Sequence, residues 1–474
     1  MKRIQLFIVA LLGAIVFAGC TTKSPPTHAE IQQQALPNIA LTNAWRAGGN
    51  TNLIQDNWLA TFNDEQLNAL VREALTNNPD LRVSAARVEQ AEQYVELAKA
   101  ALRPQVNIAG TGGFKGGGGS DVSSALQGIM LAISWEPDLW ARMRYSRNAA
   151  QATYASAQAD FEFARQSLAA TTAKSWFTAS ETWLQMQLAA DMVKSAESLA
   201  ALAGQRQQVG AGSEQDVALA RANLGNFQDA AKQINLAHQQ ALRALELLLG
   251  RYPSAELAAR ESLPALPGPV PVGMPLESLE RRPDMIAAER RVAAAFNRVG
   301  EAKAARLPRL VLNGSVAAIN SDVIQLKSDF QNPVGGFGGR LVAPVYTGGA
   351  LSAQVQIRTL EQKEAVAQYA AMALRAIGDV ENALSTGQNL AERAQLLDQT
   401  IAGQQRALEL AQTAYRVGKI DLRSVQQQQL NVYAARLAGL RVQSEQLSQR
   451  ANLHLVLGGS FETLSTNQTQ VTVN

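Results

Sequence analysis

The chain has 474 residues, of which 5% are aromatic, and its mean hydropathy is −0.10. This composition argues against a large conventional globular core and favours long helices that pack through small side chains. The net charge of +3 is small for this length, and no basic cluster interleaved with aromatic residues occurs. The sequence therefore indicates no nucleic-acid partner.

The N-terminus has the features of an export signal. Lys2 and Arg3 precede an apolar run over residues 4–18, and small residues lead up to Cys20. This order is typical of a secretory signal peptide, predicted here at 1–19. The run is too short to cross a membrane, and no later segment has 18 consecutive apolar residues.

Cys20 is the one cysteine of the chain and a candidate lipidation site. It follows Ala18 and Gly19 as in the bacterial lipobox, although Phe17 stands where leucine is usual. The resemblance implies covalent diacylglycerol and palmitate on Cys20. Because Thr21 is not aspartate, it also implies the outer membrane as the destination. The alternative is an incidental or buried cysteine.

A tether and a first helical region follow. Residues 20–55 are predicted to form the tether, irregular over 21–50, where Thr, Pro, Asn and Gly are frequent. Helical periodicity begins near Asp64, an expected N-cap, pauses at Pro79 and is stopped by Pro104. The same pattern returns from Leu276 to a stop at Pro308.

The recurrence is an internal tandem repeat. Residues 78–106 and 282–310 align without a gap, with 11 of 29 positions identical. The markers shared by the two copies are the pairs Pro79/Pro283, Pro104/Pro308 and Gly210/Gly418. We assign the first repeat to 56–256 and the second to 272–460, followed by a polar tail at 461–474. Two copies of one design favour a ring-like or tubular object over an enzyme.

Four segments alternate apolar and polar residues, at about 105–114, 126–136, 309–319 and 334–346. In the second segment, Ile129, Leu131, Ile133 and Trp135 share one face. Each segment has the length of a tilted strand that crosses a bilayer. A hairpin of an ordinary β-sandwich would show the same alternation, so this pattern alone leaves both structures open.

Long helices are predicted after each strand pair, at about 138–204 and 213–249, and at about 349–417 and 421–457. Apolar residues keep a 3-4 spacing from Val366 to Tyr415, which is typical of coiled-coil packing. A helix over 349–417 would be roughly 100 Å long. Turns at Gly210 and Gly418 send the chain back. The last helix has one seam at Leu430, Tyr433, Leu437, Leu440, Ser444, Leu447 and Ala451, and a smaller one at Val432, Ala435, Gly439 and Val442.

These parts predict an assembly. Four strands cannot close a barrel, and open sheet edges are not tolerated in lipid. Two chains would give eight strands, a barrel filled by its own side chains, whereas three chains give twelve. The predicted fold class is mainly α with membrane β. It is a trimeric twelve-stranded transmembrane β-barrel, with four strands per chain, continued by a long periplasmic α-helical barrel.

The chain resembles the TolC-like outer-membrane efflux factors, and within them the lipoprotein branch of resistance-nodulation-division systems. The similarity covers about 56–459 and is carried by NWLATFNDEQLNALVREALTNNPDLRVSAARVEQAE, AYRVGKIDLRSV, the two proline-bounded units and the lipobox. The resemblance implies a homotrimeric duct in the outer membrane of a Gram-negative bacterium. It also implies a periplasmic membrane-fusion adaptor and an inner-membrane transporter as partners, and efflux of drugs or other small toxic solutes.

The resemblance further implies a gate at the helix turns. Family members close the channel with an aspartate, a tyrosine and an arginine, and the first two correspond to Asp216 and Tyr415. The arginine position is Ile420, so Lys419, Asp421 and Arg423 are the remaining gate candidates. The acidic positions that follow in some members correspond to Ser424 and Gln427. The alternative for Asp216 is a helix cap.

No catalytic or metal chemistry is expected. His28, His238 and His454 are far apart in sequence, and no Cys/His cluster has metal-ligand spacing. The glycine-rich segments 110–119 and 335–339 lack the strand–turn–helix setting of a phosphate loop. Two alternatives stay open beside efflux. One is the outer-membrane duct of type I protein secretion, and the other is a coiled-coil periplasmic lipoprotein without a pore.

Overall fold

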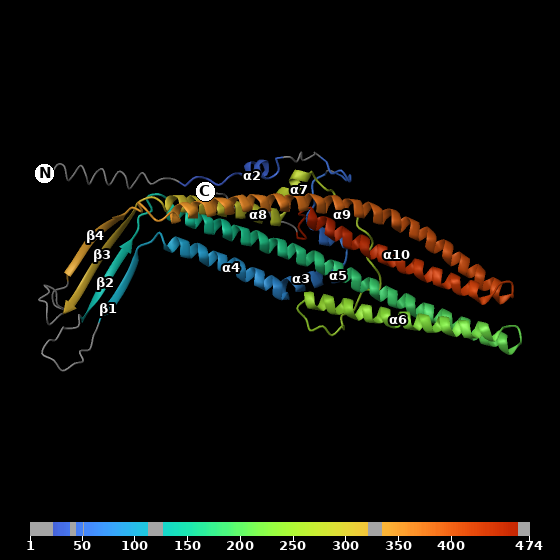
Figure 1. Ribbon diagram of the computed structural model, residues 1–474. Coiled ribbons are helices and arrows are strands. Elements are labelled where there is room, and N and C mark those ends of the chain that lie inside the picture. Colours follow the sequence, from blue (N-terminus) through green and yellow to red (C-terminus); the bar gives the residue numbers. More distant parts are fainter. Residues whose placement is uncertain (1–21, 38–43, 51, 112–126, 321–333, 463–474) are drawn as a thin grey trace, which may run out of the picture. The chain divides into compact units, whose positions relative to one another are not determined.

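The computed structural model describes residues 22–37, 44–50, 52–111, 127–320 and 334–462 (Figure 1). Several predicted features lie outside these residues. They are the signal peptide 1–19, the lipidation site Cys20, strand residues 112–114 and 126, the loops between the strands of each pair, and tail residues 463–474.

The described chain is mostly helical. In chain order its helices are α2 (His28–Ala35), the 3-10 helix η1 (Trp58–Phe62), α3 (Glu65–Asn77), α4 (Pro79–Ala100), α5 (Arg142–Gln208), α6 (Glu214–Leu248), α7 (Pro275–Arg281), α8 (Pro283–Ala304), α9 (Ala350–Arg416) and α10 (Leu422–Val456). The lengths recur: α4 and α8 have 22 residues each, α5 and α9 have 67, and α6 and α10 have 35. Among these helices, none is both long and apolar enough to cross a membrane.

The contacts divide the chain into two compact units. Unit 1 takes its described residues from 1–38, 86–159 and 287–371, and unit 2 takes them from 39–85, 160–286 and 372–474. The helices α4, α5, α8 and α9 each contribute residues to both units.

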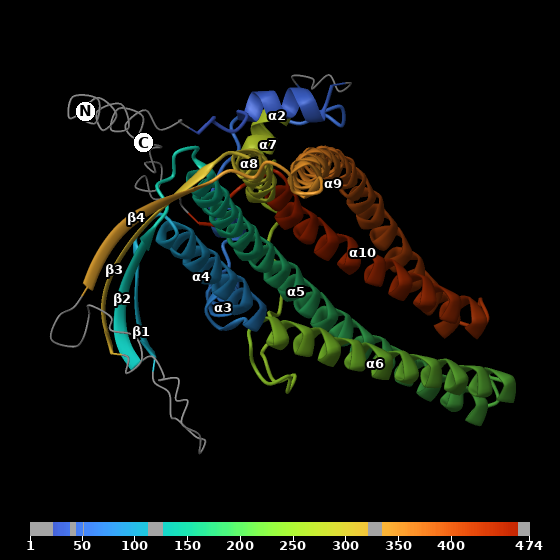
Figure 2. The same ribbon diagram turned by 60° about the vertical axis from the view of Figure 1, so that its left-hand side comes forward.

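Unit 1 contains one antiparallel sheet in the order β1-β2-β3-β4. Its strands are β1 (Gln105–Thr111), β2 (Gln127–Trp135), β3 (Arg309–Asn320) and β4 (Val334–Val342). Pro104 and Pro308 directly precede β1 and β3. Figure 2 shows the four strands side by side in one curved sheet.

The register gives the sheet two different faces. Ile133 lies opposite Val106 and Leu131 opposite Ile108, while Trp135 lies opposite Leu312. Because side chains alternate across a strand, these residues share one face. The exposed apolar side chains of this face are Val106, Ile108, Ile129, Leu131, Ile133, Trp135, Val316, Phe337 and Leu341. The other face carries mainly small and polar residues.

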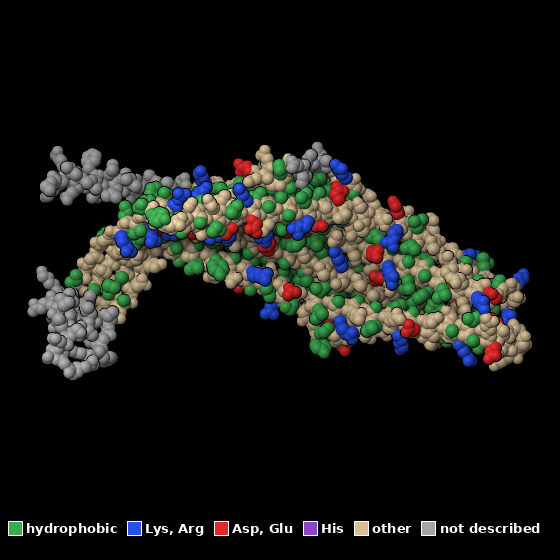
Figure 3. All heavy atoms as spheres, viewed as in Figure 1, with side chains coloured by type: hydrophobic (Ala, Val, Ile, Leu, Met, Phe, Trp, Pro, Cys, Tyr) green, Lys and Arg blue, Asp and Glu red, His purple; other side chains and the backbone are tan. Residues whose placement is uncertain are grey.

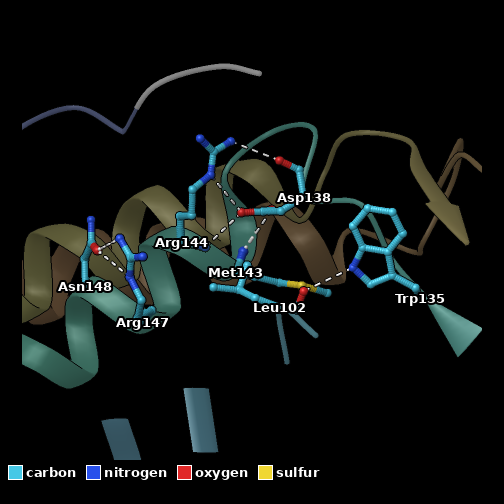
Figure 4. A network of polar contacts seen from close by, with 7 residues as sticks. All are labelled: Leu102, Trp135, Asp138, Met143, Arg144, Arg147 and Asn148. Atoms are coloured by element: carbon cyan, nitrogen blue, oxygen red, sulfur yellow. Dashed lines mark hydrogen bonds and ion pairs between the residues drawn. The ribbon is translucent and has the colours of Figure 1, made fainter. Parts of the chain in front are cut away.

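Polar contacts join the strands to the helices of unit 1 (Figure 4). Trp135 Nε1 donates to the carbonyl of Leu102 at 3.1 Å. The carboxylate of Asp138 accepts from the backbone N–H groups of Met143 at 3.1 Å and Arg144 at 2.9 Å. These bonds satisfy N–H groups at the start of α5, as an N-terminal cap does. Helix α5 therefore begins at Arg142, whereas the sequence predicted a start at about 138. It ends at Gln208, and the predicted end was at about 204.

Two further predictions about segment bounds were wrong. The strand predicted at 334–346 ends at Val342, shortly before Pro344, which has no N–H to donate to a ladder. The tail predicted from 461 begins with a buried residue, Phe461, which belongs to the main core cluster of unit 2. The guanidinium of Arg165 lies 5.5 Å from its ring centroid and pairs with Glu462.

The predicted tether is not irregular throughout. Residues His28–Ala35 form α2, which begins with a capping box between Thr27 and Glu30. Ile31 of α2 is fully buried. Ahead of the helix, the backbone N–H of Lys23 donates to the hydroxyl of Tyr145 at 2.9 Å. The N-terminal segment is thus docked on the helices of unit 1.

Unit 2 has its largest core around Trp58, Phe62, Trp176 and Phe177. Asp64 caps α3 as predicted, since its carboxylate accepts from Gln66 N and Leu67 N, both at 3.1 Å. The same buried carboxylate accepts from Trp176 Nε1 at 3.0 Å and pairs with Arg260 at 2.8 Å.

Two histidines are also packed inside unit 2. His238 is buried, and its Nδ1 lies 3.0 Å from the hydroxyl of Thr182. His454 stacks on Trp58 with ring centroids 5.8 Å apart, and burial lowers its pKa to about 4. Because an imidazole with this pKa is neutral at pH 7, His454 contributes apolar packing there.

Candidate functional site at the helix turns

Two helix turns of unit 2 use the same backbone motif. The α5–α6 turn contains Gly210 at φ 72° and the α9–α10 turn contains Gly418 at φ 76°. In the first, Gly210 N donates to Gln207 O and Ala211 N to Arg206 O. The second repeats both bonds, from Gly418 N to Tyr415 O and from Lys419 N to Ala414 O. This is the Schellman ending, in which glycine takes the left-handed conformation.

Each returning helix begins with a side-chain cap. Ser213 and Asp216 form a capping box at the start of α6, with Asp216 N donating to Ser213 Oγ at 3.1 Å. Asp421 caps α10 and accepts from Ser424 N at 2.9 Å and from Ser424 Oγ at 2.7 Å. Hydrogen bonds from Ser424 lower the pKa of Asp421, so the carboxylate is charged at neutral pH.

Arg206 joins the two turns. From the last turn of α5, its Nη1 donates to the carbonyl of Tyr415, in the last turn of α9, at 2.8 Å. Its Nη2 donates to the carbonyl of Ala211 in its own turn at 3.1 Å. The guanidinium carbon lies 4.8 Å from the centroid of the Tyr415 ring, within cation–π range. One guanidinium therefore links the last turn of α9 to the turn that follows α5.

An apolar cluster surrounds this contact. It includes Tyr415 and the buried side chains Leu199, Ala203, Val217, Ala220, Leu422 and Val425. The next layer is polar, because buried Gln429 of α10 donates to Ser195 Oγ of α5 at 2.9 Å and accepts from Asn223 of α6 at 3.5 Å. The third layer is aromatic, with Phe227 and Tyr433 edge to face at 5.5 Å. The apolar and aromatic side chains stabilise the packing of these helices. The hydrogen bonds of Gln429 determine which residues of the helices lie opposite each other.

The predicted gate residues differ in their surroundings. Tyr415 is 3% exposed, and its hydroxyl has no hydrogen-bond partner among the described residues. Burial raises the pKa of the Tyr415 hydroxyl above its ordinary value, with a smaller lowering by the charge of Arg206 and a smaller raising by that of Asp216. Ile420 packs at the edge of the apolar cluster. Lys419 and Arg423 are exposed, and neither makes an ion pair or side-chain hydrogen bond with the described chain.

Arg206 was not among the residues predicted from the sequence. The resemblance placed the arginine near Ile420 in the second turn, and Arg206 belongs to the first. Two signals were available. Basic residues in a last helical turn bond to free carbonyls, and the offset that pairs Gly210 with Gly418 sets Arg206 against Ala414, next to Tyr415.

The second seam predicted for α10 is fully buried, and the first seam is buried in part. Tyr433, Ser444, Leu447 and Ala451 of the first seam are buried, Leu437 and Leu440 are half-buried, and Leu430 is 43% exposed in the single chain. Gly439 of the second seam faces Ile401 of α9, and a Cβ there would lie 2.8 Å from Ile401 Cδ1. The glycine therefore allows close approach of α9 and α10.

The chain is similar to known efflux proteins. The family model for "Outer membrane efflux protein" matches residues 70–251 and 274–459. The pyoverdine export outer membrane protein OpmQ of Pseudomonas putida is 29% identical over 94% of this chain and 95% of its own length. The cation efflux system protein CusC of Escherichia coli is 26% identical over 94% and 97%.

Solved channels have the same fold. The outer-membrane channel OprN superposes with a TM-score of 0.82 at 25% identity and covers 94% of this chain and 99% of its own. The open state of the Neisseria gonorrhoeae MtrE outer membrane channel gives 0.77 at 25% identity, with the same two coverages. The chain belongs to the outer membrane efflux protein family.

Proposed function

We propose that three copies of this chain form one outer-membrane duct of a tripartite efflux pump, and that small solutes leave the cell passively through it. The observation that carries the proposal is the sheet of unit 1. One of its faces is apolar and exposed, with Ile108 at 76% and Phe337 at 80%. Contiguous apolar surface of this kind marks a contact with lipid or protein.

The topology of the sheet supports closure by self-association. Its edges are β1 and β4, and three successive antiparallel pairings make these two strands antiparallel to each other. The β4 edge of one copy can therefore pair with the β1 edge of the next, which leaves no free edge in lipid. Three copies supply twelve strands, and their apolar faces all point outward.

The helices support the remainder of the proposed architecture. Equal helix lengths in the two halves of the chain agree with the tandem repeat read from the sequence, with repeats at 56–256 and 272–460. The helical parts of three copies would form the periplasmic α-helical barrel. A periplasmic adaptor and an inner-membrane resistance-nodulation-division transporter would dock onto it.

The N-terminal segment supports a lipid anchor. Lys23 is bound to Tyr145, which lies in the first turns of α5, ten residues after the end of β2. Cys20 lies three positions before Lys23, and a chain of that length spans at most about 11 Å. A diacylglycerol and a palmitate on Cys20 would therefore enter the membrane close to the sheet of unit 1.

The cargo is a small solute, with drugs or other toxic compounds proposed. Relatives of similar identity are named for different cargo, since OpmQ is named for pyoverdine export, CusC for cation efflux and TtgC for toluene efflux. The non-channel lipoprotein does not account for the apolar strand surface. No observation favours the secretion duct over the efflux duct.

The contact between the two helix turns is the proposed gate. Arg206 holds the two turns together through one charge-assisted bond, to the carbonyl of Tyr415, which contributes about 1.5–3 kcal/mol. Losing one such bond would shift a closed–open equilibrium by about tenfold or more. The hydroxyl of Tyr415 takes no part in this contact. In the same structure Asp216 belongs to the capping box at the start of α6.

Substitutions at two adjacent residues of β2 test whether the sheet spans the membrane. Leu131→Arg places a charge on the apolar face near the middle of the strand, where it costs about 2–4 kcal/mol in lipid. Ala132→Arg puts the same residue on the opposite face. We expect Leu131→Arg to reduce the heat-modifiable trimer in outer-membrane fractions and Ala132→Arg to retain it. Equal trimer yields would contradict the proposal.

Cys20→Ala tests the lipid anchor. The variant is expected to incorporate no labelled palmitate, whereas the wild-type protein is labelled. Ser24→Ala, which changes a nearby residue of the same segment, serves as the control and should be labelled normally. Labelling of Cys20→Ala would refute acylation at this position.

Three substitutions at the helix turns test the gate in planar bilayers. Arg206→Gln removes the guanidinium and should raise the closed-state current, whereas Tyr415→Phe should leave it unchanged because the hydroxyl has no partner in the described chain. Arg221→Gln removes an exposed charge from α6 and is the control. A raised current for Tyr415→Phe together with an unchanged current for Arg206→Gln would contradict this account, because it would mean that the hydroxyl closes the channel. Asp216→Ala is also expected to raise the closed-state current. An unchanged current would mean that Asp216 only caps α6.

A further inference from the structure

The four strands contain two charged residues, and both are arginines. Arg309 begins β3 and Arg340 lies in β4. The register pairs Arg309 with Val342 and Val311 with Arg340. The two arginines are therefore diagonal neighbours on one face of the sheet, with about 7–8 Å between such positions. This is the face opposite to Leu310 and Leu341, the small and polar face.

Neither arginine has an internal partner. Both are exposed, and neither makes an ion pair or side-chain hydrogen bond with any described residue. The two carboxylates that follow β2 are already paired with other arginines. Glu136, directly after β2, binds Arg142 at 2.9 Å, and Asp138 binds Arg144 at 3.1 Å. Figure 3 shows hydrophobic and no acidic side chains on the visible surface of the strands.

The space around Arg340 is open. Gly336 and Gly338 precede it on the same face of β4, and a Cβ at either position would meet nothing within 4 Å. The guanidinium can therefore reach solutes without competition from neighbouring side chains. Its charge is permanent, because arginine is not deprotonated in proteins.

We propose that Arg309 and Arg340 make the duct prefer anionic solutes, such as small molecules carrying carboxylate or phosphate groups. This inference rests on the proposed function, in which the small and polar face of the sheet lines the lumen. Two arginines per chain would then give six in a trimer, at one level of the barrel. Rings of arginine select anions because their field attracts negative charge and repels cations. The strands supply no carboxylate to cancel that field.

The test is the reversal potential of purified protein in planar bilayers under a KCl gradient. The dilute side is kept at about 0.1 M, where the screening length is about 10 Å and the field of the arginines reaches the ions. The wild-type channel is expected to have a chloride-to-potassium permeability ratio above one. Arg309→Gln with Arg340→Gln should bring the ratio towards one, and the corresponding double glutamate variant should bring it below one.

A charge-retaining variant is the matched control. Arg309→Lys with Arg340→Lys should keep the preference for chloride, and heat-modifiable trimer on a gel shows that each variant assembles. Conducting channels with one common permeability ratio in all four proteins would overturn this inference and leave the duct intact. A trimer that fails to conduct even with Arg206→Gln, which removes the proposed closing contact, would overturn the proposed function itself.

Discussion

The rest of the proposed architecture depends on one constraint, the incomplete sheet of unit 1. Four antiparallel strands expose an apolar face and end in two edges, β1 and β4, whose outer backbone groups pair with no other described strand. Lipid can cover the apolar face but cannot satisfy backbone N–H and C=O groups. In the proposed barrel the edges therefore require further strands, and other copies of the chain supply edges of matching direction. Self-association would explain why four strands per chain, the number in the described residues, are enough.

The proposed gate at the helix turns has a different requirement, a contact that can be broken. The bond from Arg206 to Tyr415 O suits this role because it is polar and only partly buried. A second bond, to Ala211 O, holds the guanidinium in its own turn. An apolar cluster alone would hold the helices more permanently. The resemblance places the gate arginine at Ile420, and in the proposed gate Arg206 of the other turn supplies the guanidinium instead.

Much of the fold could be predicted from the sequence because it depends on periodicity. The strand alternation around Leu131 and the 3-4 spacing up to Tyr415 determine which faces are apolar, and Pro104 and Pro308 mark where helix gives way to strand. Single polar contacts were not predicted. The caps at Asp138 and at Thr27 of α2 are local, but Asp138 and Thr27 lie in segments without apolar periodicity. The Arg206–Tyr415 contact joins residues 209 positions apart, and only the repeat offset relates their positions.

Cross-linking the two sheet edges tests the central claim most directly. Cys20 is the one native cysteine, so cysteines introduced at Ile108 of β1 and at exposed apolar positions of β4, such as Phe337 and Leu341, can form new disulfides. If three chains close one barrel, oxidation of at least one such pair will give a ladder on a denaturing gel that ends at three chains. A ladder that ends at two chains, continues beyond three, or never forms for any pair would contradict the shared barrel.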